Sequence, residues 1–427
     1  MYQRVGAVAF KKSLDNIRAL CDALGNPETK FKSVHVAGTN GKGSTSNMLA
    51  AIFQNNGYQT GLYTSPHLFR FTERIKINGE EVSENFVISF VERIKPLIEQ
   101  LQPSFFEITV AMAFDYFAQK QVDIAIIEVG LGGRLDSTNI IQPELSIITN
   151  IAYDHQDLLG ETLTEIATEK AGIIKHATPV VIGEMHPETT PVFEQIAQDK
   201  NAPIYFAQND FEAKTVLAFL NYQTIRLFDK RIGMETKQGK VFSLDLPGLY
   251  QTKNLATVMK AVELLRMQGW KLEEDATIDA LMKVTSLTGF KGRMYCVSDD
   301  PIILCDVAHN EAGIKEVVKQ LYDYGAPKLR IVLGMVRDKT HEKILRLLPD
   351  GVYYFVAANI PRALPAMDLK KKAKAFQLKG KVYDSVVAGL EAAIADCEEE
   401  DIIFVGGSVF VVGEVLSDPR WTHVIPS

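Results

Sequence analysis

The sequence predicts an α/β protein of two domains, because short apolar runs and helical patterns alternate along most of the chain. Ser33–Ala37 and Val122–Val129 are near-continuous apolar runs, as expected for strands that helices cover on both faces. Helical patterns over Lys42–Asn55 and Phe105–Lys120 lie beside these runs. The alternation indicates a doubly wound, mostly parallel sheet in the first domain, and the glycine-rich turn before Lys42 makes it a P-loop-type sheet.

Further elements of the first domain follow the same rhythm. More strands are expected at Tyr58–Tyr63 and Leu145–Thr149, and more helices at Glu84–Gln100, Leu163–Ile174, Gln251–Met267 and Glu274–Lys283. Between residues 211 and 247, short alternating runs are separated by turn signals, which predicts a small antiparallel excursion from the sheet. The polar, glycine-marked stretch Ser286–Arg293 is interpreted as the linker to the second domain.

A second α/β series begins at Pro301. Its apolar runs IILCDVA, KLRIVLGMV, GVYYFVAA and DIIFVGG predict strands, and helices are expected from Asn310, near His341–Leu348 and near Val386–Cys397. We therefore expect one α/β domain over residues 1–290 and a smaller, Rossmann-like α/β domain over residues 295–427.

The composition is that of an ordinary globular protein, with 46% hydrophobic and 23% charged residues among 427. The net charge of −7 favours neither nucleic acid nor an anionic membrane as a partner. The four cysteines form no CxxC pair, which disfavours a disulfide or zinc scaffold and suits a reducing compartment. The N-terminal segment becomes charged before any apolar run reaches signal-peptide length, and the apolar stretch Ile402–Val415 is too short to cross a bilayer. We therefore expect a cytoplasmic protein.

A phosphate-binding loop is expected where the first strand meets its helix. The loop consists of Gly38, Thr39, Asn40, Gly41, Lys42, Gly43 and Ser44. Its glycines let backbone N–H groups approach an anion, and Lys42 can reach the outer phosphates of a nucleotide. The loop departs from the usual GxxxxGK[ST] pattern, since Gly43 separates Lys42 from Ser44. An ordinary strand-to-helix turn is the alternative, which a lysine between two glycines makes less favourable.

The loop and a series of further motifs resemble one family of ATP-dependent amide ligases. These motifs are Thr64–Leu68 (TSPHL), Glu73–Gly79 (ERIKING), Ser104–Glu107 (SFFE), Glu128–Asn139 (EVGLGGRLDSTN), Asp154–His155, Glu169–Lys175, Gly292–Arg293 and Asp306–Asn310 (DVAHN). In this order they resemble the folylpolyglutamate synthase/dihydrofolate synthase family, which is related to the Mur ligases. One departure is Glu311, where the family carries proline. An acidic residue also suits the first turn of a helix, so we expect little consequence.

Glu128 is the strongest candidate for a metal ligand from the residues alone. It ends an apolar strand beside Gly130, at the edge where α/β sheets bind ligands, although a solvated glutamate is the alternative. The resemblance implies that Ser65, Glu128 and His155 hold Mg²⁺, as two ions, together with a CO₂-derived carbamate on Lys170. From the residues alone, His155 could equally cap a loop. Lys170 could equally be a surface lysine paired with Glu169 or Glu165.

An aromatic corner is expected to hold the folate substrate. By resemblance, the pteridine and pteroate pocket is lined by Ser104, Phe105, Phe106, Glu107, Leu135, Asp136 and Ser137. The aromatic residues open a helix that is apolar nearly all round, so a role in the hydrophobic core is the alternative. Glu107 is unusual in such a run, because a buried carboxylate needs a partner or a ligand. Asp136 or Glu107 could accept N–H groups from the ring.

The second half of the site is expected to come from the linker and the second domain. The resemblance implies that Asn254, Arg293 and Asp306 contact ATP, although Asn254 could simply cap the helix that it opens. Arg293, on the linker, would neutralise phosphoryl charge once the cleft closes. His309 and Ser408 follow strands and are expected to bind glutamate. Lys42, Lys170, Arg293 and His309 are the expected catalytic residues.

The resemblance implies that residues 1–290 form an ATP-binding domain like the central domain of the Mur ligases, and that residues 295–427 form a glutamate-ligase domain. It implies an ADP-forming ligase that converts a carboxylate of dihydropteroate or a folate into an acyl phosphate and joins it to L-glutamate. The expected partners are these small molecules, and a monomer is expected. One alternative is a Mur-type ligase for UDP-linked peptides, but the loop begins at Gly38 and leaves no room for a nucleotide-sugar domain before it. The other alternative is a non-catalytic nucleotide-binding protein, against which the joint presence of the expected site residues argues. The sequence leaves open which substrate is preferred and how many glutamates are added.

Overall fold

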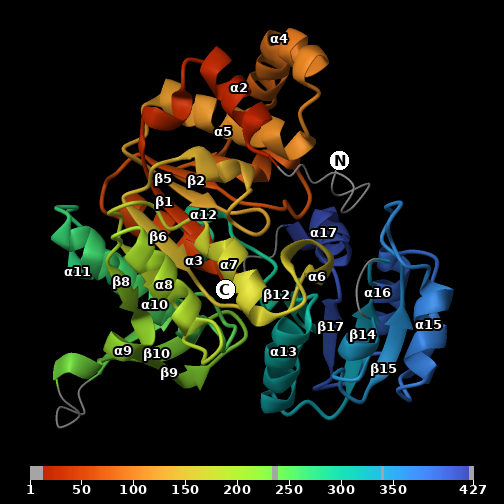
Figure 1. Cartoon of the computed structure of the whole chain (residues 1–427). Coiled ribbons are helices and arrows are strands. Elements are labelled where there is room, and N and C mark those ends of the chain that lie inside the picture. Colours follow the sequence, from red (N-terminus) through yellow and green to blue (C-terminus); the bar gives the residue numbers. More distant parts are fainter. Residues whose placement is uncertain (1–12, 233–238, 338–340, 423–427) are drawn as a thin grey trace.

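The computed structural model describes residues 13–232, 239–337 and 341–422. It has two α/β domains that lie side by side, with the N-terminal domain in red to green and the C-terminal domain in teal and blue (Figure 1). Each domain is built on its own sheet, and a third, smaller sheet belongs to the N-terminal domain. The two-domain α/β prediction is confirmed.

The large sheet of the N-terminal domain is mostly parallel. Its strands, in their order across the sheet, are β4 (Glu80–Glu81), β3 (Ile75–Ile77), β2 (Thr60–Tyr63), β5 (Ile124–Glu128), β1 (Lys32–Ala37), β6 (Leu145–Ile148), β7 (Val180–Ile182) and β8 (Ile204–Phe206). The strands β3 and β4 are antiparallel additions at one edge. The central strand β1 lies between β5 and β6, so the chain leaves it at a point where the direction of winding reverses.

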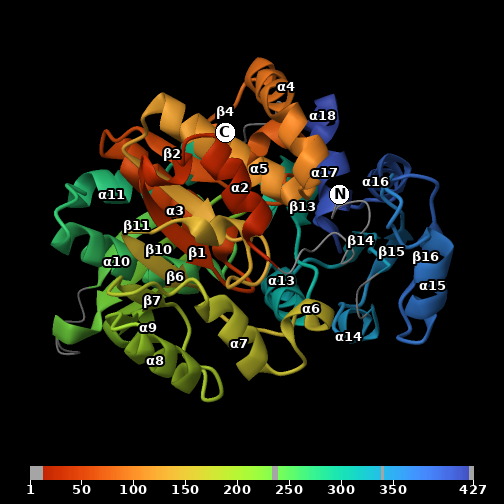
Figure 2. The same cartoon turned by 45° about the horizontal axis from the view of Figure 1, so that its top comes forward.

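Helices cover both faces of this sheet because its central strands are apolar on both sides. One face packs on α3 (Lys42–Asn55), α10 (Gln251–Met267), α11 (Glu274–Leu281) and α12 (Val284–Thr288). The other face packs on α2 (Asp15–Ala23), α4 (Glu84–Leu101), α5 (Phe105–Lys120), α7 (Leu163–Ala171) and α8 (Thr190–Asp199). Figure 2 shows α2, α4 and α5 together at one end of the domain, with α10 and α11 on the opposite side of the sheet.

The antiparallel excursion is also confirmed. It forms a three-stranded sheet in the order β11 (Lys240–Leu244), β10 (Gln223–Asp229) and β9 (Phe211–Ala218). Ile225, Leu227 and Phe242 of this sheet join the same apolar core as α10, which holds the small sheet against the domain. A short helix α9 (Ala207–Asp210) leads into it.

The C-terminal domain is a six-stranded sheet between two layers of helices. Its strands lie in the order β12 (Tyr295–Asp299), β13 (Ile302–Asp306), β17 (Ile402–Gly406), β14 (Leu329–Leu333), β15 (Val352–Phe355) and β16 (Lys379–Val382), and only β12 is antiparallel. One layer holds α13 (Glu311–Asp323), α14 (His341–Leu345) and α15 (Ala366–Lys374). The other layer holds α16 (Val386–Ala395) and α17 (Val409–Ser417), and α18 (Pro419–Thr422) follows.

Two sequence-based expectations need correction. The expected linker Ser286–Arg293 is irregular only from Gly289 onward, because its first residues complete the helix α12. Several elements were not predicted at all, among them α2, α8, α15, α17 and the edge strands β3, β4, β12 and β16. Among the helices of the described ranges, none has the length and apolar character that a membrane span requires.

Candidate active site

A large cavity lies between the two domains, with a volume of about 470 Å³. The N-terminal domain contributes the segments that follow the carboxyl ends of β1, β5 and β6, and the C-terminal domain those that follow β13 and β17. This is the edge at which parallel α/β sheets bind ligands. All of the expected site residues line this one cavity, although they come from segments as far apart as Gly38 and Ser408.

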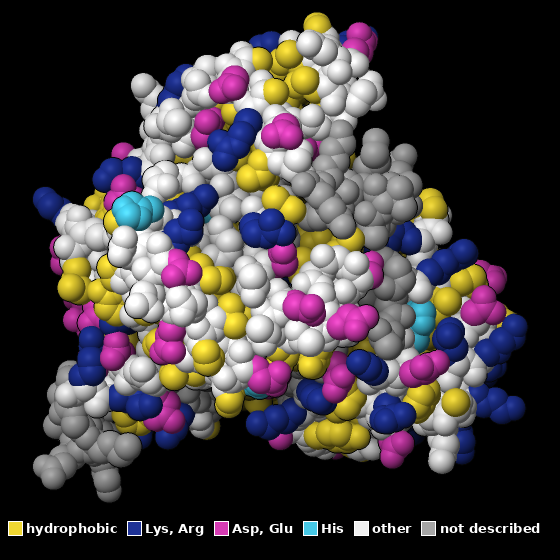
Figure 3. Space-filling model, viewed as in Figure 1, with side chains coloured by type: hydrophobic (Ala, Val, Ile, Leu, Met, Phe, Trp, Pro, Cys, Tyr) yellow, Lys and Arg dark blue, Asp and Glu magenta, His cyan; other side chains and the backbone are white. Residues whose placement is uncertain are grey.

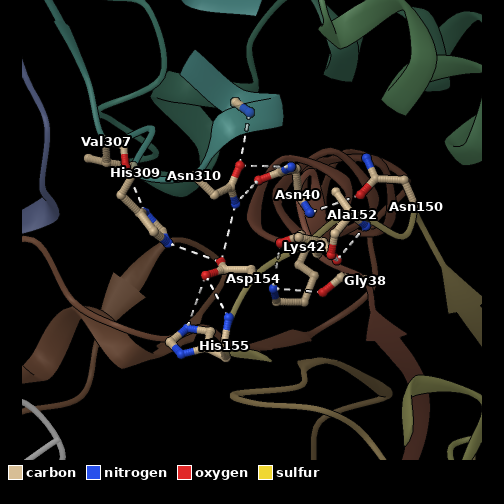
Figure 4. Close-up of polar contacts among 12 residues, drawn as sticks. Gly38, Asn40, Lys42, Asn150, Ala152, Asp154, His155, Val307, His309 and Asn310 are labelled. Carbon is tan, nitrogen blue, oxygen red and sulfur yellow. Dashed lines mark hydrogen bonds and ion pairs between the residues drawn. The ribbon is translucent and has the colours of Figure 1, made fainter. Parts of the chain in front are cut away.

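The loop of residues 38–44 presents an uncapped helix end to the cavity. The helix α3 begins after Gly41, which has a left-handed φ of 83° and no side chain to cap the first turn. Backbone N–H groups of that turn therefore remain free to bind an anion, which the partial positive charge of the helix end also attracts. Lys42 Nζ donates to the carbonyls of Gly38 and Thr39 at 3.0 and 3.1 Å, as Figure 4 shows for the contact with Gly38. Burial lowers the pKa of Lys42, and the nearby Glu128 opposes that shift.

The carboxylate of Glu128 faces the loop from the neighbouring strand β5. It is 5% exposed and its Oε2 accepts the backbone N–H of Ser65 at 3.0 Å. Burial raises the pKa of Glu128, while the positive charge of Lys42 lowers it. The alternative of a solvated strand-end glutamate is therefore wrong. A buried carboxylate that contacts Ser65 beside an anion-binding loop supplies the oxygen donors that Mg²⁺ prefers, so these residues fit the ion.

Lys170 is buried, so the alternative of a surface lysine is also wrong. It is 4% exposed, and its Nζ donates to the carbonyl of Gly38 at 2.9 Å. Glu169, its expected surface partner, pairs with Arg134 at 2.8 Å instead. Burial, which is the larger effect, and the positive charge of Lys42 lower the pKa of Lys170 to about 7.

Three side chains that can bind a cation meet across the cleft. One ligand atom each from Asp154, His155 and His309 lies within 4.8 Å of the others. His309 Nε2 lies 3.4 Å from Asp154 Oδ2, and its Nδ1 lies 3.0 Å from the carbonyl of Val307 (Figure 4). His155 stands at the N-cap position of the short helix α6 (Gln156–Leu159) without a side-chain cap bond, which argues against the capping alternative. Sequence reasoning missed Asp154, although its position beside a histidine was a signal.

In the expected folate pocket, the carboxylates of Glu107 and Asp136 form hydrogen bonds with other groups of the protein. Glu107 closes a reciprocal cap with Ser104 at the start of α5. Asp136 accepts the backbone N–H groups of Leu131 and Thr138 at 2.8 and 3.0 Å, and burial raises its pKa. Through these hydrogen bonds, both carboxylates hold the backbone of the pocket wall in place.

Arg74 was missed, yet it lines the same pocket. It is 3% exposed, its guanidinium carbon lies 5.5 Å from the centre of the Phe105 ring, and its Nε donates to His67 Nδ1 at 2.8 Å. Arg74 belongs to the motif Glu73–Gly79, but no local pattern marks that arginine as buried or as part of the pocket.

The opposite wall holds Asn254, Arg293 and Asp306. Asn254 does not open a helix as expected: α10 begins at Gln251, and Asn254 Nδ2 donates to the side chain of Gln251 at 2.7 Å. Asp306 accepts hydrogen bonds from Tyr250 Oη at 2.7 Å and from the backbone of Met294 and Ala308. Arg293 is half-buried, and its charge lowers the pKa of Glu128 across the cavity.

Ser408 has a local role as well as a place in the cavity. It caps the helix α17, because its hydroxyl accepts the N–H of Val411 at 3.3 Å. On the face of the molecule seen in Figure 3, acidic and basic side chains are interspersed.

Comparison with known proteins agrees with this architecture. Models of the Mur ligase middle domain and of the Mur ligase glutamate ligase domain match residues 36–262 and 292–409. The dihydrofolate synthase/folylpolyglutamate synthase of Bacillus subtilis is 32% identical, covering 95% of this chain and 94% of its own. The Escherichia coli protein solved with DHPP and ADP is 30% identical with a TM-score of 0.83, covering 97% and 95% of the two chains. 

A third relative was solved with a nucleotide analogue and a metal. The bifunctional folylpolyglutamate synthase/dihydrofolate synthase of Yersinia pestis, complexed with AMPPNP and a Mn ion, is 27% identical with a TM-score of 0.79, covering 96% and 94% of the two chains. With matches of this extent to both domains in order, the chain belongs to the folylpolyglutamate synthase/dihydrofolate synthase family of ATP-dependent, ADP-forming ligases.

Proposed function

We propose that the interdomain cavity binds ATP, L-glutamate and either dihydropteroate or a reduced folate, and joins the last two through an acyl phosphate. The observation that carries this proposal is that one cavity brings together the uncapped loop, the buried Glu128, the aromatic corner and the strand ends of the C-terminal domain. An anion site and a flat aromatic pocket in one enclosed space suit a nucleotide and a pterin.

The phosphates of ATP would lie against the free N–H groups of residues 41–44, with Lys42 moving its three donors from the carbonyls of Gly38 and Thr39 to the phosphate oxygens. Asn254 and Asp306 line the part of the cavity in which we place the rest of the nucleotide. Magnesium, held by Ser65, Glu128 and His155, would neutralise charge on the transferring phosphoryl group. Arg293, on the linker, would bring a second positive charge to the same phosphoryl group.

In the proposed reaction, a carboxylate oxygen of the folate substrate takes the γ-phosphoryl group, and ADP leaves. The neutral amine of L-glutamate then attacks the acyl carbon, the C–O bond to phosphate breaks and the nitrogen loses one proton, so that an amide and inorganic phosphate are formed. Phe105, Phe106 and Leu135 would hold the ring system, while His309 and Ser408 would orient the amino acid. The enclosure of the cavity would keep water away from the acyl phosphate.

Lys170 is proposed to carry a carbamate. A neutral amine attacks CO₂ and releases one proton, so the reaction needs the low pKa that burial gives Lys170. Because the pKa is about 7, the neutral fraction increases as the pH rises through that value, and carbamylation should increase between about pH 6 and about pH 8 at constant dissolved CO₂. A crystal series over this range should show density beyond Nζ that grows with pH.

Kinetics provide a second test of the carbamate. Lys170→Ala should be inactive and partly rescued by acetate, which would replace the lost anion. Lys175→Ala is the matched control, because Lys175 donates to the carbonyl of Asn139 and does not line the cavity. A bare lysine above pH 8 with magnesium bound, or a Lys170→Ala enzyme of normal activity, would contradict the proposal.

The substrate assignment is tested by a panel in which ATP and L-glutamate are combined with either dihydropteroate or tetrahydrofolate. We expect ADP release that requires both the pterin substrate and glutamate, and products heavier by one glutamyl unit in mass spectra. ADP release without glutamate, or no product with either pterin, would contradict it.

A further inference from the structure

The start of the helix α13 contains a side chain that joins the two domains at the phosphate loop. Asn310 is 6% exposed and stands at the N-cap of α13, where its Oδ1 accepts the N–H of Gly313 at 2.9 Å. Its Nδ2 donates to Asn40 Oδ1 at 2.9 Å and to Asp154 Oδ2 at 3.2 Å (Figure 4). Both amide hydrogens of Asn310 are thereby used by the other domain.

The contact between the two asparagines is reciprocal. Asn40 Nδ2 lies 3.4 Å from Asn310 Oδ1, so the two amides face each other with a donor and an acceptor from each side. Among the described residues, the hydrogen bonds that reach loop 38–44 from the C-terminal domain come from Asn310. Asn40 is tied to its own domain as well, since its N–H donates to Asn150 Oδ1 at 3.0 Å and its carbonyl accepts from the Thr149 hydroxyl at 2.6 Å.

Asn310 itself does not reach the cavity. Its neighbours Ala308, His309 and Gly313 line the cavity, whereas Asn310 is not among the lining residues. Toward the N-terminal domain, its side chain can therefore influence a bound ligand only through Asn40 and Asp154. Both of these residues do line the cavity.

We propose that Asn310 is a positioning residue that latches the C-terminal domain to the phosphate loop, so that the loop reaches its working geometry only when the domains are closed. The proposal rests on the family's ATP-dependent reaction taking place in this cavity. Loss of the two cross-domain hydrogen bonds should weaken closure and lower turnover, while leaving the fold of each domain unchanged.

The capping role of Asn310 must be separated from its latching role. Asn, Asp and Ser are comparable N-caps, so Asn310→Ser and Asn310→Asp both keep the cap of α13. Serine is too short to reach Asn40, and aspartate lacks the two donors and faces Asp154 with a like charge. A purely structural cap predicts that both variants behave like the wild type. The proposed latch predicts that both variants have a lower kcat, and that the loss is larger for the aspartate variant. Ser385→Ala is the matched control, because it removes a cap from α16 in the same domain.

The experiment measures the full-length protein in two ways. In steady-state kinetics with ATP varied, Asn310→Ser should lower kcat by about tenfold, as expected for two lost hydrogen bonds. Combining it with Asn40→Ser should cost less than the product of the two single losses, because the two side chains share one contact while Asn310 also bonds to Asp154. In small-angle X-ray scattering with ADP and Mg²⁺, the radius of gyration of Asn310→Ser should exceed that of the wild type and of Ser385→Ala.

Scattering and kinetics of Asn310→Ser and Asn310→Asp that match the wild type would overturn the latch, as would losses that multiply in the double variant. If the proposed function were wrong, the experiments would give a different result. The wild type would then form no glutamyl product, while the scattering comparison would still report on the latch.

Discussion

Two strand-to-helix turns face each other across the cavity, and they are built in opposite ways. Loop 38–41 between β1 and α3 ends on Gly41 and leaves the first turn of the helix uncapped. The turn between β13 and α13 ends on Asn310, whose side chain caps the helix. The related turn before α17 is capped in the same way by Ser408. Free N–H groups bind anions, whereas capped ones do not. The N-terminal turn is therefore suited to phosphate, and the C-terminal turns are suited to presenting side chains.

The largest effect is expected at the uncapped turn. Lys42→Ala removes the only lysine of loop 38–44, and kcat/KM should fall by at least about 100-fold, as for other positioned donors in phosphoryl and acyl transfer. The melting temperature should change little, because within the described part of the chain the side chain of Lys42 donates only to carbonyls of its own loop. Phosphate release and circular dichroism provide the measurements. Lys315→Ala on α13, which removes an exposed pair with Glu311, should be silent. A folded, active Lys42→Ala enzyme would refute the phosphate-loop assignment.

The linker arginine should come next. If Arg293 acts mainly in the closed transition state, Arg293→Ala should lower kcat and kcat/KM together by about 100-fold. Arg293→Lys should restore little, because an ammonium does not replace the planar guanidinium. Steady-state kinetics with ATP varied decide the matter. An unchanged kcat with a raised KM for ATP would show that Arg293 contributes only to the binding of ATP in the ground state.

The conformation of the two turns can be compared with a matched pair of glycine substitutions. At Gly41 a Cβ would lie 2.2 Å from Asn254 Oδ1, and the left-handed φ adds about 1–2 kcal/mol for any other residue. Gly41→Ala should therefore raise the KM for ATP by about tenfold. At Gly313 the nearest atoms would lie 3.3 Å from the new Cβ, and the backbone is helical, so Gly313→Ala should change this KM by less than about threefold. Equal effects of the two substitutions would remove the distinction between the turns.

The smallest effect is expected at the capped turn before α17. Ser408→Ala should lower the free energy of unfolding by about 1 kcal/mol through loss of the cap. If the hydroxyl also orients the amino acid, the KM for L-glutamate should rise by about three- to tenfold at constant kcat. Urea unfolding and kinetics with glutamate varied measure the two effects. Ser385→Ala should reproduce the change in stability alone, and identical KM values for the two variants would limit Ser408 to capping.

Elements with strong local patterns were predicted from the sequence almost residue by residue. The helices Lys42–Asn55, Phe105–Lys120 and Gln251–Met267 have the expected bounds, because apolar periodicity, caps and glycines are local signals. The edge strand β16 and the lysine-rich helix α15 were missed. Residues such as Lys379–Val382 become a strand only because β15 offers a partner, and α15 presents few apolar residues to signal its buried face.

The residues of the candidate site also fall into two groups, those with a local sequence signal and those that depend on tertiary contacts. The motifs of the sequence indicated many of the residues that line the cavity, although Arg74 and Asp154 were missed. Only the tertiary structure decided that Lys170 is buried with a lowered pKa, that Arg74 lies beside Phe105, and that Asn310 pairs with Asn40 from 270 residues away. Burial and cross-domain pairing depend on which surfaces meet after folding, and no stretch of neighbouring residues encodes that meeting by itself.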